Sequence, residues 1–218
     1  MIRPRNIDPG QYPHPNALIT GLLMDNAAYW VAAGQSVALA TAPAGTTLTL
    51  AAAAVRPLPL AQSVSVTFAG GPTNGDITLR IRGVNQFNET ITQDITSLSG
   101  QAAGVITPAA NAITTKVFRK VTSVQVVSNA NTAAATISVG TSSNVAQFKI
   151  GIPVKIARVA ETVRFQHFVA LVGANNLLGV SSVVDLSNHA IFVGAIAAAG
   201  GTLCIFQLDL NVNTGQRG

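Results

Sequence analysis

Hydrophobic and polar residues alternate along several short stretches of this chain, most clearly over residues 77–82. Ile77, Leu79 and Ile81 are separated by single polar residues. A period of two places the apolar side chains on one face of a β-strand and the polar ones on the other. The pattern therefore predicts a strand with one buried and one solvated face.

A polar turn at residues 85–88 follows, and residues 89–96 alternate again, so residues 77–96 predict a β-hairpin. Three more β-type runs come later, at residues 114–120, 121–128 and 134–139. These elements predict an all-β fold, an antiparallel, jelly-roll-like β-sandwich.

Residues 76–139 also resemble a known family. The run from Lys116 to Val124, followed by a strand that ends in Val139-Gly140, is similar to a β-sandwich segment of virion structural proteins of tailed bacteriophages. The resemblance covers about a third of the chain. It implies an all-β structural protein, and it carries no catalytic motif.

The flanking regions give further expectations. Residues 26–33 suggest a short helical turn, whereas residues 35–39, 46–53 and 63–68 suggest strands. The glycine-rich residues 70–75 lack the Gly-Lys-Ser/Thr of a phosphate-binding loop and predict a hairpin loop.

The C-terminal part continues in the same style. Residues 163–171, 178–186, 190–197 and 206–212 predict strands, with a turn at residues 197–201 between the final two. We expect three regions: an extended arm at 1–17, a β-sandwich at 18–142, and additional strands at 143–218. The last region either packs on the sandwich or forms a second small β domain.

Charge is scarce in this chain of 218 residues. Charged residues make up 10% of it, against about 25% in typical soluble domains. Between Asp25 and Arg56 there is no charged residue at all, yet glycine, proline, serine and threonine interrupt that stretch and argue against a membrane-spanning helix. A surface so poor in charge is typical of a subunit covered by copies of itself or by another protein.

The first candidate contact region is the proline-rich N-terminus, where proline density prevents helix and central strand. We expect this arm to lie across neighbouring subunits. Its candidate interface residues are Arg3, Arg5, Pro9, Tyr12 and Pro13.

The second candidate region is a group of basic residues on the predicted sheet. They are Arg80, Arg82, Lys116, Arg119 and Lys120. A nucleic-acid reader would also offer exposed aromatics or a recognition helix, and neither is visible. We therefore expect a protein-facing or solvated sheet surface without specific nucleic-acid binding.

No residue pattern predicts catalysis or a cofactor. The eight acidic residues are scattered, the three histidines are dispersed, and no nucleophile lies in a recognisable motif. Asp185 and His189 are four apart and are expected to share a turn. We expect no enzymatic activity, no metal site and no cofactor.

Composition and resemblance together predict a capsid cement or decoration protein, synthesised in a host cytoplasm and located in the virion. Its expected partners are the major capsid protein and its own copies, in a closed oligomer such as a trimer. A tail, fibre or head-to-tail component is the second structural alternative. A carbohydrate-binding module is the alternative from another class.

Overall fold

The computed structural model describes residues 17–23, 26–69, 75–97, 104–105, 113–132, 134–141, 149–151, 163–171, 174–176, 184–185, 187–192 and 202–210. Within them the strands form three sheets, and every strand pair is antiparallel. The predicted all-β antiparallel fold is therefore confirmed. In the described part of the chain, no helix combines the length and hydropathy needed to cross a membrane.

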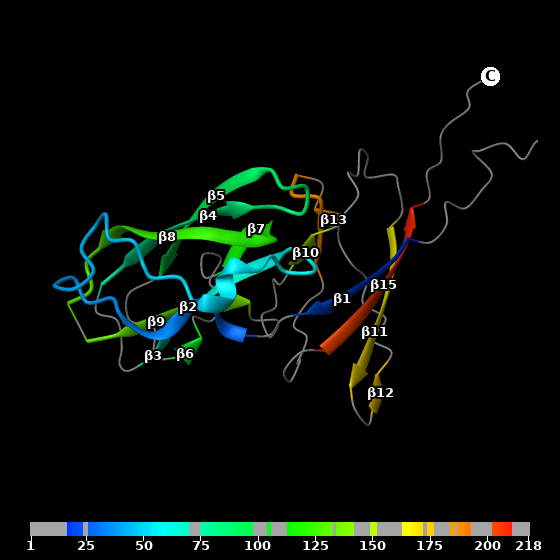
Figure 1. The fold of residues 1–218 in the computed structure, drawn as a ribbon, viewed down its shortest axis with the longest axis horizontal. Coiled ribbons are helices and arrows are strands. Elements are labelled where there is room, and N and C mark those ends of the chain that lie inside the picture. Colours follow the sequence, from blue (N-terminus) through cyan, green and yellow to red (C-terminus); the bar gives the residue numbers. More distant parts are fainter. Residues whose placement is uncertain are drawn as a thin grey trace, which may run out of the picture.

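Two of the sheets face each other as a sandwich (Figure 1). The smaller sheet has the order β5-β4-β8, with β4 at Ile77–Val84, β5 at Thr90–Ser97 and β8 at Lys120–Asn129. The larger sheet has the order β13-β14-β10-β3-β9-β2, and β6 and β7 also pair with β3. Its strands are β2 (Asn26–Ser36), β3 (Gln62–Ala69), β6 (Gly104–Val105), β7 (Ile113–Phe118), β9 (Thr136–Thr141), β10 (Lys149–Gly151), β13 (Val184–Asp185) and β14 (Ala190–Phe192).

The alternation at residues 77–82 has the predicted consequence. Ile77, Leu79 and Ile81 are buried, whereas the residues between them are partly or fully exposed. The predicted hairpin is also confirmed: β4 pairs with β5 across the turn, in which Asn85 Oδ1 accepts hydrogen bonds from the backbone N–H of Phe87 and of Glu89. This side-chain capping fixes the turn and hence the register of the hairpin.

The core fills the space between the two sheets. The smaller sheet contributes Leu79, Ile81 and Val124, and the larger one contributes Val66 and Val139. Branched aliphatic residues of this kind pack well between closely stacked sheets. Trp30 and Phe118 are the largest of the fully buried side chains in the described core.

Residues 37–60, which we call the strap, close one side of the sandwich. The strap pairs with β8, where Leu48 N–H donates to the Val124 carbonyl at 2.8 Å, and with β2, where Ala51 N–H donates to the Trp30 carbonyl at 2.8 Å. It contains a short 3-10 helix, η1 (Ala52–Val55). Because the strap bonds to both sheets, it satisfies backbone groups that would otherwise form exposed edges.

Bulges curve the smaller sheet around the core. The register of β4 with β8 shifts between Arg82 and Gly83, which is the signature of a bulge that bends the strand. A Cβ atom at Gly83 would lie 2.1 Å from the Lys120 carbonyl oxygen. The close approach of the two backbones therefore requires glycine at this position.

The third sheet contains both early and late parts of the chain. Its order is β1-β15-β11-β12, with β1 at Ala17–Leu23, β11 at Val163–Leu171, β12 at Ala174–Asn176 and β15 at Thr202–Leu210. Strand β1 thus pairs with the C-terminal region, whereas β10, β13 and β14 join the larger sandwich sheet. Strand pairs therefore connect the predicted sandwich region, 18–142, with the predicted C-terminal region, 143–218, in both directions. The division into domains remains a prediction.

Three local predictions are wrong. Residues 26–33 form part of β2 instead of a helical turn, because this strand pairs with β9 and the strap and its central residues 29–31 are buried. Residues 46–53 form isolated bridges and η1 instead of a strand. The connection at residues 70–75 joins β3 and β4, which belong to different sheets, so it is not a hairpin loop.

The predicted C-terminal strands are confirmed in part. Residues 163–171 lie in β11 and residues 206–210 in β15, while residues 184–185 and 190–192 lie in β13 and β14. The rest of the predicted runs at 178–186, 190–197 and 206–212 falls outside the residues that the structure places in strands or describes. The turn at 197–201 falls outside the described residues, and the strands on either side of it, β14 and β15, belong to different sheets.

Candidate interaction surfaces

The predicted contact residues divide into two groups. Those of the arm lie outside the described residues: Arg3, Arg5, Pro9, Tyr12 and Pro13. The five basic residues of the sheet are described, and they do not form a single patch.

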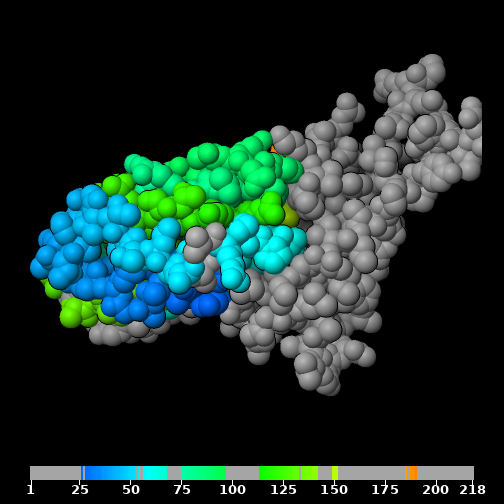
Figure 2. Space-filling view, in the orientation of Figure 1, coloured from blue at the N-terminus to red at the C-terminus, as the bar shows by residue number. Residues whose placement is uncertain are grey.

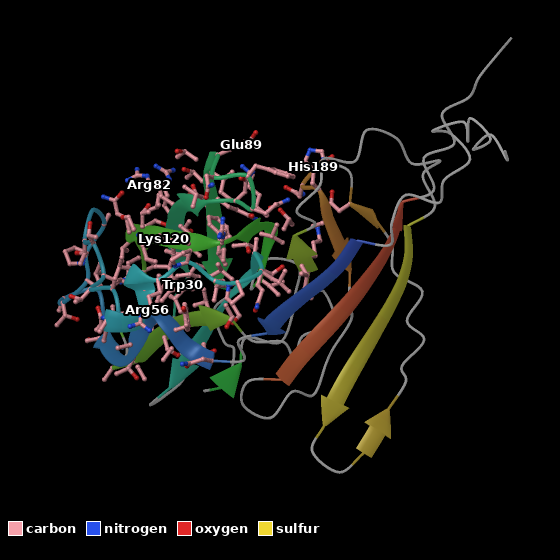
Figure 3. All side chains as sticks on the ribbon, turned by 45° about the vertical axis from the view of Figure 1, so that its right-hand side comes forward. Trp30, Arg56, Arg82, Glu89, Lys120 and His189 are labelled. Atoms are coloured by element: carbon pink, nitrogen blue, oxygen red, sulfur yellow. The ribbon has the colours of Figure 1, made fainter. Side chains whose placement is uncertain are left out.

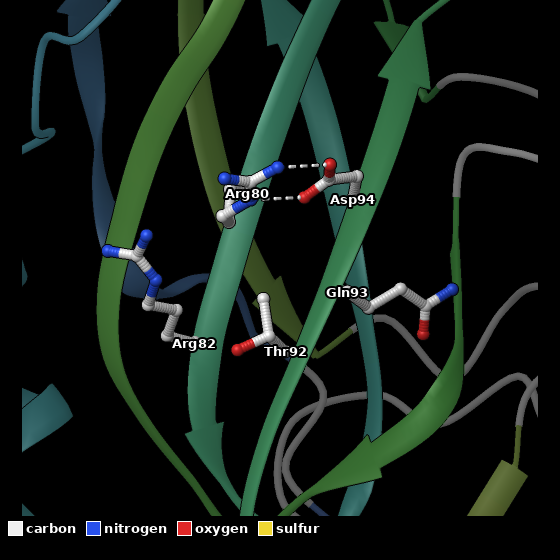
Figure 4. A pocket seen from close by; sticks show the side chains of 5 residues that line it. All are labelled: Arg80, Arg82, Thr92, Gln93 and Asp94. Atoms are coloured by element: carbon white, nitrogen blue, oxygen red, sulfur yellow. Dashed lines mark hydrogen bonds and ion pairs between the residues drawn. The ribbon is translucent and has the colours of Figure 1, made fainter.

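Arg80 and Arg82 lie on the outer face of the smaller sheet, which we call the basic face (Figure 4). Together with Thr92, Gln93 and Asp94 they line an open depression of ≈ 480 Å³. The hairpin register places Arg80 opposite Asp94 and Arg82 opposite Thr92. Cross-strand neighbours on one face are close enough for their side chains to interact.

Arg80 and Asp94 form a bidentate ion pair. The Nε and Nη2 atoms of Arg80 each donate to one carboxylate oxygen of Asp94, both at 2.8 Å (Figure 4). Both side chains are more than a third exposed, at 37% and 41%. Water screens such a pair, so it orients the two side chains more than it stabilises the fold.

This pair predicts a small pH-dependent effect. The hydrogen bond from Arg80 holds the pKa of the Asp94 carboxyl below its usual range. A depressed folded pKa contributes stability above the unfolded pKa, and this contribution is lost as the pH falls through the folded pKa. We expect Asp94→Asn to lower the free energy of unfolding slightly at neutral pH and to have no effect in strong acid. Urea denaturation of both proteins over a pH series measures this, and a difference that does not change with pH would contradict it.

Arg82 has a different role from Arg80. It is exposed, and its guanidinium forms no ion pair with any residue that the structure describes. A planar guanidinium presents donors that match a carboxylate. The Arg82 guanidinium is therefore the group that the basic face offers to an acidic partner, because Asp94 already neutralises Arg80.

Lys116 closes the gap between β5 and β7. Its ammonium donates to the Thr92 carbonyl at 2.9 Å, and its backbone N–H donates to Gln93 Oε1 at 2.9 Å. Strand β5 lies at the edge of its sheet, and these bonds occupy backbone and amide groups that face outward. A lysine at this position also discourages pairing with another strand.

Arg119 and Lys120 lie away from the depression, at the corner between β7 and β8. Arg119 is half-buried, and its Nε approaches the Leu58 carbonyl of the strap at 3.4 Å. Lys120 is half-buried and pairs with Val84 at the end of β4. Neither Arg119 nor Lys120 lines the depression with Arg80 and Arg82.

The exposed residues from Asn26 to Val55, on β2 and most of the strap, form a second candidate, which we call the uncharged surface. No residue from Asn26 to Val55 carries a charge, and many of them are exposed, including Ala32, Ala33, Leu39, Ala40, Pro43 and Ala44. Among the described residues, the large hydrophobic residue that is exposed is Leu39, with 40% of its surface accessible to solvent. In Figure 2 this region, in blue shades, covers the left-hand end of the sandwich.

The third candidate is a polar cluster, which lies where Asp185 and residues 187–190 meet the sandwich. Lys149 Nζ donates to Asp185 Oδ2 at 2.6 Å, and Gln86 of the β4–β5 turn donates to the carbonyls of Asn188 and His189. Phe87 and His189 stack edge to face, with ring centroids 5.4 Å apart. Figure 3 places His189 beside this hairpin turn.

Sequence reasoning missed Asp94, Lys149 and Asn188. The pairing of Asp94 with Arg80 could have been predicted from sequence, because a hairpin that turns at residues 85–88 places these two residues opposite each other. Asp185 was expected to share a turn with His189. The turn exists, and within it Asp185 accepts hydrogen bonds from the backbone N–H and the side-chain amide of Asn188.

The described residues contain no group of three or more His, Cys, Asp or Glu side chains that would hold a metal ion. The fold and its surfaces define the chain as an antiparallel β-sandwich protein with a third antiparallel sheet. Comparison with protein-family models, with curated proteins and with solved structures finds no match for this chain.

Proposed function

We propose that this chain is a non-enzymatic structural protein of a tailed-phage virion, acting as a capsid cement or decoration protein. In this role it binds the outside of the shell as an oligomer. Many copies of a modest contact, repeated over a symmetric lattice, add up through multivalency. Low charge is the compositional feature that supports this role.

The uncharged surface is the observation that carries the proposal. A protein that functions alone in water normally intersperses charges over its surface, because bare apolar area promotes association. Here the exposed residues from Asn26 to Val55 carry none, the first charge along the strap being that of the exposed Arg56, and many of them, such as Ala32, Ala33 and Ala44, have small side chains. Such a surface can approach a partner closely and lose little side-chain entropy on binding.

The position of the phage-like segment also supports the proposal. Residues 76–139 supply the whole smaller sheet and the neighbouring strands β7 and β9. The resemblance therefore concerns the sandwich itself. The basic face, with Arg82 outermost, would meet acidic groups of the major capsid protein.

Leu39→Asp tests the uncharged surface. The substitution places a carboxylate in the proposed contact, where it would be buried without a partner, so binding to capsids should weaken about tenfold or more. The strap and sandwich should remain folded, because Leu39 is exposed. Co-sedimentation of the purified protein with shells that lack it measures binding, and circular dichroism checks the fold.

Ser187→Asp is the matched control, since Ser187 is exposed in the turn before β14 and belongs to neither the uncharged surface nor the basic face. It adds the same charge and should leave binding nearly unchanged. Equal binding by Leu39→Asp and the unaltered protein would remove the uncharged surface from the contact. A freely soluble single-copy protein that attaches to no shell would contradict the proposed function as a whole. Reconstruction of intact particles separates a capsid position from a tail or fibre position.

A further inference from the structure

Lys149, Asp185 and Asn188 form a partly buried triad that the proposed function does not use. Lys149 Nζ donates to Asp185 Oδ2 at 2.6 Å, and Asn188 Nδ2 donates to the same oxygen at 2.8 Å. One carboxylate oxygen thus bridges an amine and a side-chain amide. The two nitrogen atoms are therefore held in one small volume.

The ion pair of the triad is largely shielded from water, and Asn188 is half-buried. The side chain of Lys149 is 7% exposed and that of Asp185 is 15% exposed. The Lys149 ammonium also donates to the Thr115 carbonyl at 3.2 Å. Ala61, Val117 and Ala190 form a buried apolar cluster built from the surrounding segments.

The surrounding contacts fix the amide as well as the amine. Asn188 N–H donates to Asp185 Oδ1 at 3.3 Å, and Gln86 Nε2 donates to the carbonyls of Asn188 and His189 at 3.3 Å and 3.0 Å. The turn that carries Asn188 is therefore held against the sandwich by bonds other than the ion pair. Holding two reacting groups in a fixed geometry replaces a collision between them by an intramolecular step.

We propose that Lys149 and Asn188 join in an intramolecular isopeptide bond, with Asp185 as the proton carrier. Lys149 Nζ, an ammonium in the ion pair, passes one proton to Asp185 Oδ2 and attacks Cγ of Asn188 as the free amine. The new Nζ–Cγ bond forms, Nζ gives up a second proton, and the Cγ–Nδ2 bond breaks as the departing nitrogen takes up both protons by way of Asp185. The nitrogen leaves as ammonium, Asp185 is again a carboxylate, the chain is lighter by one ammonia, and no oxidant, reductant or other reactant is needed.

The position of Asp185 suits both of its tasks. Its Oδ2 is hydrogen-bonded to the nucleophile and to the leaving group, so one oxygen serves as general base and then as general acid. Burial alone would raise the pKa of the Asp185 carboxyl, but the bonds from Lys149 and Asn188 outweigh it and hold the pKa below its usual range. The ion pair is therefore the resting state, and the reaction begins with proton transfer along the 2.6 Å bond.

The product would be a covalent link between β10 and the turn before β14. It would close a loop of the chain in the unfolded state, as a disulfide does, and so stabilise the folded state without an oxidising environment. This inference does not depend on the proposed function, since the triad lies outside the uncharged surface and the basic face.

Intact mass spectrometry of the purified full-length chain tests the proposal. We expect a mass lower than that of the sequence by one ammonia, after allowing for the initiator methionine. A protease digest should then contain a branched peptide that joins Lys149 to residue 188. An unchanged mass in the folded protein would overturn the proposal without any variant. Loss of one water, with a branch at Asp185, would overturn the assignment of Asn188 as the electrophile.

Two variants separate the reaction from folding. Lys149→Arg keeps a cation beside Asp185 but removes the nucleophilic amine, and Asn188→Ala removes the electrophile while leaving the ion pair. We expect both to have the full sequence mass. Ammonia loss that persists in Lys149→Arg would come from another asparagine and would overturn the proposal.

Discussion

Replacing Phe118 with alanine is expected to lower the free energy of unfolding by about 3 to 5 kcal/mol. Phe118 is fully buried in the core cluster between the two sandwich sheets, at the end of β7. One ring carbon lies 2.9 Å from the position that a Cβ atom at Gly83 would occupy. The ring therefore fills space right up to the β4 backbone, and its removal leaves a cavity that rigid sheets on both sides cannot close.

Chemical denaturation measures this effect, and Trp30 supplies the signal because it is the chain's single tryptophan and lies in the same core cluster. Leu39→Ala is the matched control. It removes a large apolar side chain from an exposed position, so its cost should stay below about 0.5 kcal/mol. Equal costs for the two variants would show that Phe118 does not pack as described.

Replacing Trp30 with alanine is expected to cost a similar amount, about 3 to 5 kcal/mol. Trp30 is fully buried, and its ring meets Tyr29 edge to face with centroids 4.6 Å apart at 88°. Its carbonyl accepts the bond from Ala51 that fastens the strap to β2. Loss of the ring would thus leave a cavity beneath the strap. Thermal unfolding followed by circular dichroism measures the change.

Trp30→Phe separates packing from hydrogen bonding. The indole Nε1 has no hydrogen-bond partner among the residues described, so phenylalanine loses part of the volume but no bond. We expect this variant to recover most of the stability lost in Trp30→Ala. A loss as large as that of alanine would show that the indole nitrogen is bonded in solution.

The strands that sequence could predict have one buried and one solvated face. In β4, Ile77, Leu79 and Ile81 enter the core and the residues between them do not, so burial appears in the sequence as a period of two. The same holds for the β4–β5 hairpin, whose turn is set by local hydrogen bonds from Asn85. Residues within a few positions of one another carry this information.

Strand β2 shows where such reasoning fails. Tyr29, Trp30 and Val31 are consecutive and all buried, because β9 and the strap both pack on this strand and its register shifts at bulges. A run without alternation is compatible with helix or strand, and only the distant segments that cover it decide between them.

The candidate sites divide in the same way. Sequence alone determined that this chain has an all-β fold, little charge and no charged residue from Asn26 to Val55, since these follow from composition and local alternation. Tertiary structure decided that Arg80 is neutralised while Arg82 is not, that Arg119 and Lys120 do not line the depression with them, and that Lys149 meets Asp185 and Asn188. The physical reason is that each of these contacts depends on strand register and on pairing between segments far apart in the chain, which no local pattern encodes.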